Sequence, residues 1–219
     1  MVTEQVLFIQ MPHTGSGAVH EVLLRTKGLN IIDVVAHQSY KYSVEKCVEA
    51  GYIVPPAFAF VRNPWLWNVS MWTWAYHVCG NRRGFAKTGR TFMDFLEFRR
   101  KFEEGREYEG IYDGVFSGMQ GAWRNLGGDE VQFIGRTETI FEDGPRILST
   151  VMPHLVSFGW AKEQFLDIGL LNEVNQPGTN HFHGPYQTFY TPETRGWIAK
   201  WEAEIIDRFG YTFEGGPRG

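Results

Sequence analysis

A run of small residues near the start of the chain, Thr14-Gly15-Ser16-Gly17, has the composition of an anion-binding loop. An apolar run over residues 6–11 precedes it, and a helical pattern over residues 18–24 follows it. Glycines let backbone N–H groups converge on a ligand, and the N-terminus of the next helix adds free donors and partial positive charge. The order strand, small-residue loop, helix therefore predicts a cradle for a phosphate-like group.

This loop resembles the one found in sulfotransferases that use 3'-phosphoadenosine-5'-phosphosulfate (PAPS), which commonly contains Pro-Lys-Thr-Gly-(Ser/Thr)-(Ser/Thr). The matching residues are Pro12, Thr14, Gly15 and Ser16. His13 stands where that family usually has Lys, and Gly17 stands where it usually has a hydroxyl residue. The loop is not the P-loop of nucleoside triphosphatases, because no Lys sits at the helix entry.

A second stretch resembles another signature of the same family. An apolar run over residues 57–61 ends in Arg62-Asn63-Pro64, and Ser70 lies eight residues beyond Arg62. The resemblance implies that Arg62 and Ser70 hold the 3'-phosphate of PAPS. A guanidinium at a strand end offers paired donors to phosphate oxygens, and a hydroxyl on the adjacent helix adds a third. Asn63 and Pro64 also form a good helix start.

Two later phrases extend the resemblance over most of the chain. Residues 133–138, Phe-Ile-Gly-Arg-Thr-Glu, resemble a family strand that ends in Gly-Arg-x-Glu. Residues 209–213, Phe-Gly-Tyr-Thr-Phe, resemble the end of the carbohydrate-type, sulfotransferase family 2-like branch. We expect this last phrase to serve core packing.

The resemblance implies transfer of a sulfuryl group from PAPS to a hydroxyl or amine of a carbohydrate-like or small-molecule acceptor. Such an in-line displacement depends on positioning and charge stabilisation, and it leaves 3'-phosphoadenosine-5'-phosphate (PAP) as product. The resemblance calls for no metal. The residues that it assigns to the cofactor are Pro12, His13, Thr14, Gly15, Ser16, Gly17, Ala18, Arg62 and Ser70.

Two histidines are the predicted catalytic residues. In the family, the loop Lys stabilises charge on the leaving group, and His13 can replace it only as an imidazolium. Its reference pKa is about 6.5, and a polyanionic cofactor raises it. His37, after the second predicted strand, is the predicted general base, with Glu138, His181 and His183 as weaker candidates.

Other functions are also considered. The loss of the loop Lys is compatible with a catalytically weakened member that binds PAPS or PAP in a regulatory role. A nucleotide kinase is disfavoured because the Gly-Lys-Ser/Thr sequence is missing. The net charge of −4 and the lack of a recognition motif argue against a nucleic-acid partner.

The bulk properties indicate one globular domain over residues 1–219. No stretch approaches the roughly 20 apolar residues of a membrane span, and the first predicted strand begins too early for a signal peptide. We therefore expect a cytoplasmic protein, of bacterial or viral rather than Golgi type. Cys47 and Cys79 give no metal-binding spacing. Acceptor identity and oligomeric state have no sequence signal.

The order of predicted elements indicates an α/β protein with a P-loop-like, three-layer fold, in which helices flank a central, mostly parallel sheet. Ligands of such sheets bind beyond the carboxyl ends of the strands. The predicted strands are residues 6–11, 31–36, 57–61 and 131–135, and the predicted helices are residues 18–24, 43–50, 63–77, 91–102, 116–123, 143–155 and 191–209. Residues 80–90 and 172–187 are expected to be irregular, and Arg99 is expected on the outside of its helix.

Overall fold

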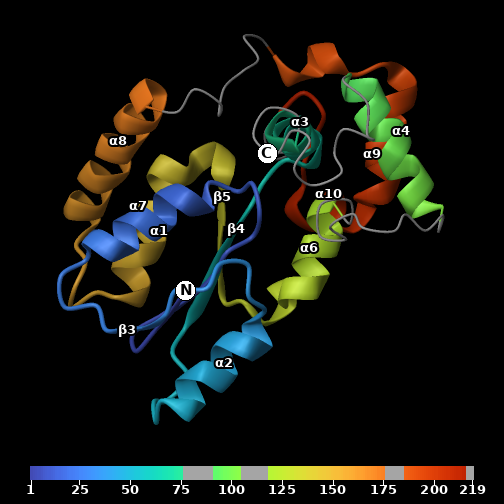
Figure 1. Cartoon of the computed structure of the whole chain (residues 1–219). Helices are drawn as coiled ribbons and strands as arrows, with labels where there is room; N and C mark the ends of the chain where they lie inside the picture. Colours follow the sequence, from blue (N-terminus) through green and yellow to red (C-terminus); the bar gives the residue numbers. More distant parts are fainter. Residues whose placement is uncertain (76–90, 105–117, 176–184, 216–219) are drawn as a thin grey trace. The chain divides into compact units, whose positions relative to one another are not determined.

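The computed structural model describes residues 1–75, 91–104, 118–175 and 185–215 (Figure 1). The chain divides into two compact units, which are described separately. The first contains Met1–Arg62 and Ala122–Asn175, and the second contains Asn63–Gly121 and Gln176–Gly219. Whether they make one domain, as the sequence predicts, stays a prediction.

The first unit is built on a five-stranded sheet with the order β3-β1-β2-β4-β5. The strands are β1 (Val2–Thr3), β2 (Leu7–Ile9), β3 (Ile31–Asp33), β4 (Ala57–Val61) and β5 (Phe133–Arg136). The pairs β2–β4 and β4–β5 are parallel, whereas β1 is antiparallel to both β2 and β3. The predicted, mostly parallel sheet is confirmed, with β1 as an additional strand that the sequence analysis did not predict.

Helices cover both faces of this sheet. Helices α1 (Ser16–Arg25), α7 (Ile140–Val151) and α8 (Phe158–Asn175) gather on one face, and α2 (Tyr40–Glu49) lies against the other (Figure 1). The three-layer α/β architecture predicted from the sequence is therefore confirmed.

The main core of the first unit lies between the sheet and α1, α7 and α8. Phe8 of β2 stacks on Phe58 of β4 with ring centroids 4.8 Å apart, and both rings are buried. Burying one such side chain stabilises the fold by about 1.5–3 kcal/mol. Gly135 of β5 lies so close to Phe60 that an added Cβ would stand 2.4 Å from its ring. This core keeps the ends of the parallel strands in register.

Several element boundaries in the first unit differ from the prediction. Strand β3 ends at Asp33 rather than at residue 36, and α7 spans Ile140–Val151 rather than residues 143–155. Helix α8 was not predicted, and its end occupies part of the stretch expected to be irregular. Its buried residues Ala161, Phe165 and Ile168 recur at helical spacing and face the core.

The second unit contains α3 (Pro64–Trp74), α4 (Phe92–Glu103), α9 (Pro192–Trp201) and α10 (Ala203–Phe209). Helix α6 (Gly118–Leu126) runs from this unit into the first. In the described part of the chain, no helix has the length and apolar character needed to cross a membrane.

The predicted helix starts in this unit are confirmed. Asn63 caps α3 by accepting hydrogen bonds from the amides of Trp65 and Leu66, at 3.1 and 3.4 Å. The same side chain donates to the carbonyl of Thr212 at 2.9 Å. Thr191 and Thr194 form the capping arrangement at the start of α9.

The predicted single helix over residues 191–209 is wrong, because Glu202 interrupts it. This residue separates α9 from α10 and is fully buried. Its carboxylate accepts hydrogen bonds from the amides of Met119 and Gln120, at 3.1 and 2.7 Å. The break between α9 and α10 therefore lets the Glu202 carboxylate bind two amides in the first turn of α6, where backbone amides have no partner within the helix.

The expectation that Arg99 lies outside its helix is also wrong. Arg99 is fully buried, and its Nη2 lies 2.6 Å from Oε1 of Glu202. Its Nη1 donates to the side-chain oxygen of Asn68 at 2.6 Å. A buried arginine is stable only when charged and polar partners replace water, and these two residues supply them.

Candidate functional site

The small-residue loop connects the end of β2 to the start of α1, as predicted, but α1 begins at Ser16 rather than at residue 18, so Ser16 and Gly17 lie in its first turn. Two of its residues have left-handed backbone conformations, His13 with φ 58° and Gly15 with φ 74°. Glycine suits position 15 for a second reason, because an added Cβ would stand 2.7 Å from Cδ1 of Ile140. A histidine at positive φ is uncommon and costs conformational energy, which the surrounding structure must supply.

The N-terminus of α1 opens directly from this loop. Gly15 is the N-cap, and no side chain caps the helix. The amides of Ala18 and Val19 both donate to the Gly15 carbonyl, so the two preceding helical amides have no partner within the helix. The first turn carries no acidic residue. These features leave backbone donors and the positive end of the helix dipole available to an anion.

The hydroxyl of Thr14 is used inside the loop. Thr14 is fully buried, and its Oγ1 donates to the carbonyl of Met11 at 2.8 Å. Its proton therefore stabilises the turn, and only its oxygen lone pairs stay available to a further partner. Gly17 is exposed, and a Cβ built there meets no atom within 4 Å, so this position has room for a side chain or a ligand group.

Arg62 joins the end of β4 to the loop. Its half-buried side chain donates from Nη1 to the carbonyl of His13 at 3.0 Å. Beside it, Oγ1 of Thr137 donates to the carbonyl of Val61 at 3.1 Å, which ties the end of β5 to the end of β4. The carboxyl ends of three parallel strands thus converge with the loop, as expected for a ligand site in an α/β sheet.

The side chain of His13 is uncharged at neutral pH in this arrangement. Burial, together with the nearby charges of Arg62 and His37, lowers its pKa to about 3. His13 therefore contributes no fixed positive charge to the ligand-free loop. A bound polyanion would oppose both effects.

The hydrogen bonding of His37 defines which ring nitrogen is basic. His37 is exposed, has φ 56°, and places Nδ1 2.8 Å from the carbonyl of Gln10. A carbonyl only accepts, so Nδ1 carries the hydrogen and Nε2 carries the lone pair in the neutral ring. Among the described residues, Nε2 of His37 has no hydrogen-bond partner, so it can accept a proton close to the loop.

The remaining candidates are not brought together by the described structure. Ser70 is half-buried on α3 in the second unit, so its pairing with Arg62 stays a prediction. Glu138 is exposed in the short 3-10 helix Thr137–Thr139. His181 and His183 lie outside the described residues. Among the described residues, no group of three or more His, Cys, Asp or Glu is arranged to hold a metal ion.

Arg136 is a further candidate for the anion site. It lies in the phrase over residues 133–138, but no role was predicted for it from the sequence. It is the last residue of β5 and pairs in register with Val61, so it lies at the same sheet edge as Arg62. Its amide donates to the carboxylate of Asp143 at 2.9 Å. An arginine at the end of an apolar strand could have identified Arg136 as a binding residue from the sequence, as the same pattern did for Arg62.

Comparisons with known proteins are consistent with this description at the level of the fold. No family model matches the sequence, and no curated protein matches it. The chain has an α/β fold of the sulfotransferase type. It is similar to the crystal structure of mouse sulfotransferase SULT7A1 complexed with PAP, with a TM-score of 0.58 over 93% of this chain and 84% of that one. The sequence identity is 14%.

Proposed function

We propose that this protein is a sulfotransferase that moves a sulfuryl group from PAPS to a hydroxyl or amine of a carbohydrate-like or small-molecule acceptor. The observation that carries the proposal is the uncapped N-terminus of α1, which follows a loop held by the guanidinium of Arg62. The similar mouse sulfotransferase was solved with PAP, which supports the same cofactor class here.

The residues of the loop fit a phosphosulfate group. The first two amides of α1, at Ser16 and Gly17, have no partner within the helix and converge beside the left-handed Gly15. The open space at Gly17 leaves room for a ligand oxygen. Arg62, and in this proposal Ser70, hold the 3'-phosphate.

When bound, PAPS supplies an activated sulfuryl group. The protein positions it and stabilises charge on the leaving phosphate. A bound polyanion would raise the pKa of His13, and the protonated ring could then stabilise charge on the leaving group. His37 accepts the proton of the acceptor hydroxyl or amine at Nε2, because its Nδ1 hydrogen is held by Gln10.

A second candidate function has a specific observation in its favour. With its pKa lowered to about 3, His13 is a poorer charge stabiliser than lysine in the free protein. A chain that binds PAP or PAPS through the loop but does not transfer sulfate would show the same fold and the same Arg62 contact.

The two candidates are separated by calorimetric titration with PAP, followed by transfer of labelled sulfate from PAPS to a panel of carbohydrate acceptors. Arg62→Ala should abolish PAP binding. Arg146→Ala, which removes an exposed arginine of α7 with a side chain 61% accessible, is the matched control. Absence of PAP binding by the unmodified protein would overturn both candidates.

The role of His13 is tested in the transfer assay. His13→Lys should retain transfer, and His13→Ala should lose it while still binding PAP. Binding without transfer by the unmodified protein, together with transfer by His13→Lys, would identify the protein as the binding-only form. Equal transfer by the unmodified protein and His13→Ala would exclude the catalytic role of His13.

A further inference from the structure

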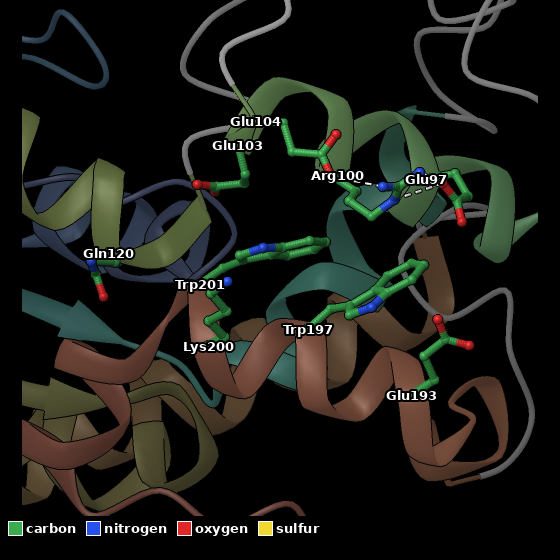
Figure 2. Close-up of a pocket in the computed structure, with 9 residues that line it drawn as sticks. All are labelled: Glu97, Arg100, Glu103, Glu104, Gln120, Glu193, Trp197, Lys200 and Trp201. Carbon is green, nitrogen blue, oxygen red and sulfur yellow. Dashed lines mark hydrogen bonds and ion pairs between the residues drawn. The ribbon is translucent and has the colours of Figure 1, made fainter.

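The second unit contains a pocket to which the proposed function assigns no role. The pocket lies between α4 and α9 and has a volume of about 680 Å³, within the range of roughly 300–1,000 Å³ typical of small-molecule sites (Figure 2). All the residues that line it belong to the second unit. The site can therefore be described without reference to the anion-binding loop.

Two tryptophans of α9 form the aromatic wall of this pocket. The rings of Trp197 and Trp201 lie side by side, with centroids 5.9 Å apart and planes inclined by 34° (Figure 2). The guanidinium of Arg100 lies 5.7 Å from the Trp197 ring, and that of Arg99 lies 5.2 Å from the Trp201 ring. These arginines hold the indoles in place, so the wall is preorganised. Both indoles stay partly exposed.

By contrast, Trp65 and Trp67 of α3 are 4% and 0% exposed. Their rings belong to the core of the second unit and offer no face to a ligand.

The charges around the pocket favour a cationic ligand. Four carboxylates line it, against the two cations Arg100 and Lys200, and one of the four, Glu103, pairs with the buried Arg99 at 3.4 Å. Arg100 already pairs with two of the four, Glu97 at 2.9 Å and Glu104 at 2.7 Å. Glu193, on the first turn of α9, has no ion pair among the described residues and is exposed. A negative, aromatic-lined pocket repels acidic ligands and attracts ammonium groups.

We propose that this pocket binds an amino sugar, that is, a saturated ring carrying protonated amines. The flat C–H face of such a ring packs against the exposed parts of Trp197 and Trp201, and an ammonium group reaches Glu193. Arg99 and Arg100 already make cation–π contacts with the two indoles. We therefore expect the rest of the indole surface to stack on a sugar ring rather than to bind a further cation. This inference does not depend on PAPS or on the proposed sulfuryl transfer.

The test is calorimetric titration, in the absence of PAP, with a tetramer of glucosamine and with its fully N-acetylated counterpart. The two probes share the same ring and linkage but differ in charge at every amine. The glucosamine tetramer should bind at least about tenfold more tightly, and its binding should weaken as salt is added, because charge attraction is screened. Equal binding of the two probes, or no binding of either at millimolar concentration, would overturn the proposal.

Variants connect this preference to the pocket. Glu193→Gln should reduce the affinity for the charged tetramer severalfold, Glu193→Asp should restore it, and Trp197→Ala should weaken both probes. Glu163→Gln, an equally exposed glutamate on α8 of the first unit, is the charge-matched control. Thermal melting checks that each variant is folded. If Glu193→Gln and Glu163→Gln bind the charged tetramer equally well, the pocket is not the site.

Discussion

Arg99 and Glu202 form an ion pair in which both side chains are fully buried, with 2.6 Å between Nη2 and Oε1. The pair connects α4 to the break between α9 and α10. Because the second oxygen of Glu202 accepts the amide of Gln120, the same carboxylate also fixes the start of α6. The carboxylate of Glu202 therefore connects α4, the start of α6 and the break between α9 and α10.

Removal of one member of this pair should destabilise the protein strongly. Arg99→Met leaves a buried carboxylate without its counter-ion, and we expect the free energy of unfolding to fall by about 3–5 kcal/mol. Chemical denaturation measures this change. Arg146→Met breaks the pair with Asp143, in which the arginine side chain is 61% accessible, and it should cost less than about 1 kcal/mol. Similar losses for the two variants would contradict a special role for the buried pair.

Gly118 should be intolerant of any side chain for the same structural reason. It has φ 71°, and an added Cβ would stand 2.0 Å from Oε1 of Glu202. We expect Gly118→Ala to lower the melting temperature by several degrees. Gly196→Ala in α9, where a Cβ meets nothing within 4 Å, should raise stability by up to about 1 kcal/mol through helix propensity. An unchanged Gly118→Ala melt would show that the ion pair can move aside.

Binding of PAP should be coupled to proton uptake at His13. The pKa of His13 is lowered to about 3 in the free protein, and a bound phosphate raises it. The complex then binds more protons than the free protein, so affinity should fall as the pH rises through the pKa of the complex. Calorimetry in buffers of different ionisation enthalpy measures the uptake directly, with His13→Gln as the variant that should show none. An uptake that persists in His13→Gln would assign the proton elsewhere.

The same histidine should make folding stability depend on pH in the acid range. Its pKa is near 6.5 in the unfolded chain and about 3 in the folded one. Its contribution is therefore complete above pH 6.5 and is lost as the pH falls toward 3, because the unfolded chain binds the proton first. His13→Gln should show a shallower loss of stability between these values in urea titrations. Parallel curves for the two proteins would argue against the low pKa.

The two loop glycines should respond differently to substitution. Gly15→Ala places a Cβ in a left-handed residue and 2.7 Å from the end of the Ile140 side chain, so PAP binding should fall about tenfold or more. Gly17→Ser adds a hydroxyl where the structure has open space, and we expect tighter binding of PAP. Titration of both variants tests this contrast. Equal loss in both would contradict the room for a hydroxyl at Gly17.

The part of the fold and site that depends on local sequence could be predicted. The apolar run of β4, the Asn63-Pro64 helix start and the small-residue loop before α1 each lie within a few residues, and the structure contains all three. The convergence of Arg62 with the loop also followed from the parallel order of β2 and β4. These features are set by short-range patterns and by the topology of α/β sheets.

The part that depends on distant partners could not be predicted. Nothing near Arg99 in the sequence shows that a carboxylate 103 residues away is buried beside it, so its charge alone favoured an exposed position. The low pKa of His13 likewise depends first on burial by the folded chain and then on the charge of Arg62, whose contact spans 49 residues. Strand β1 is too short for a periodic signal. Helix α8 did carry such a signal, in Ala161, Phe165 and Ile168, and it was overlooked.

The amide of Asn63 has a consequence for the order in which the protein is made. Its Oδ1 accepts a hydrogen bond from the amide of Trp65 in the first turn of α3, and its Nδ2 donates to the carbonyl of Thr212, 149 residues later. During synthesis, α3 leaves the ribosome long before its partner segment exists. The second unit therefore cannot complete its packing until translation is almost finished, and its apolar helix α3 must wait in an unprotected state. Chaperone dependence during translation should accordingly concentrate on this unit.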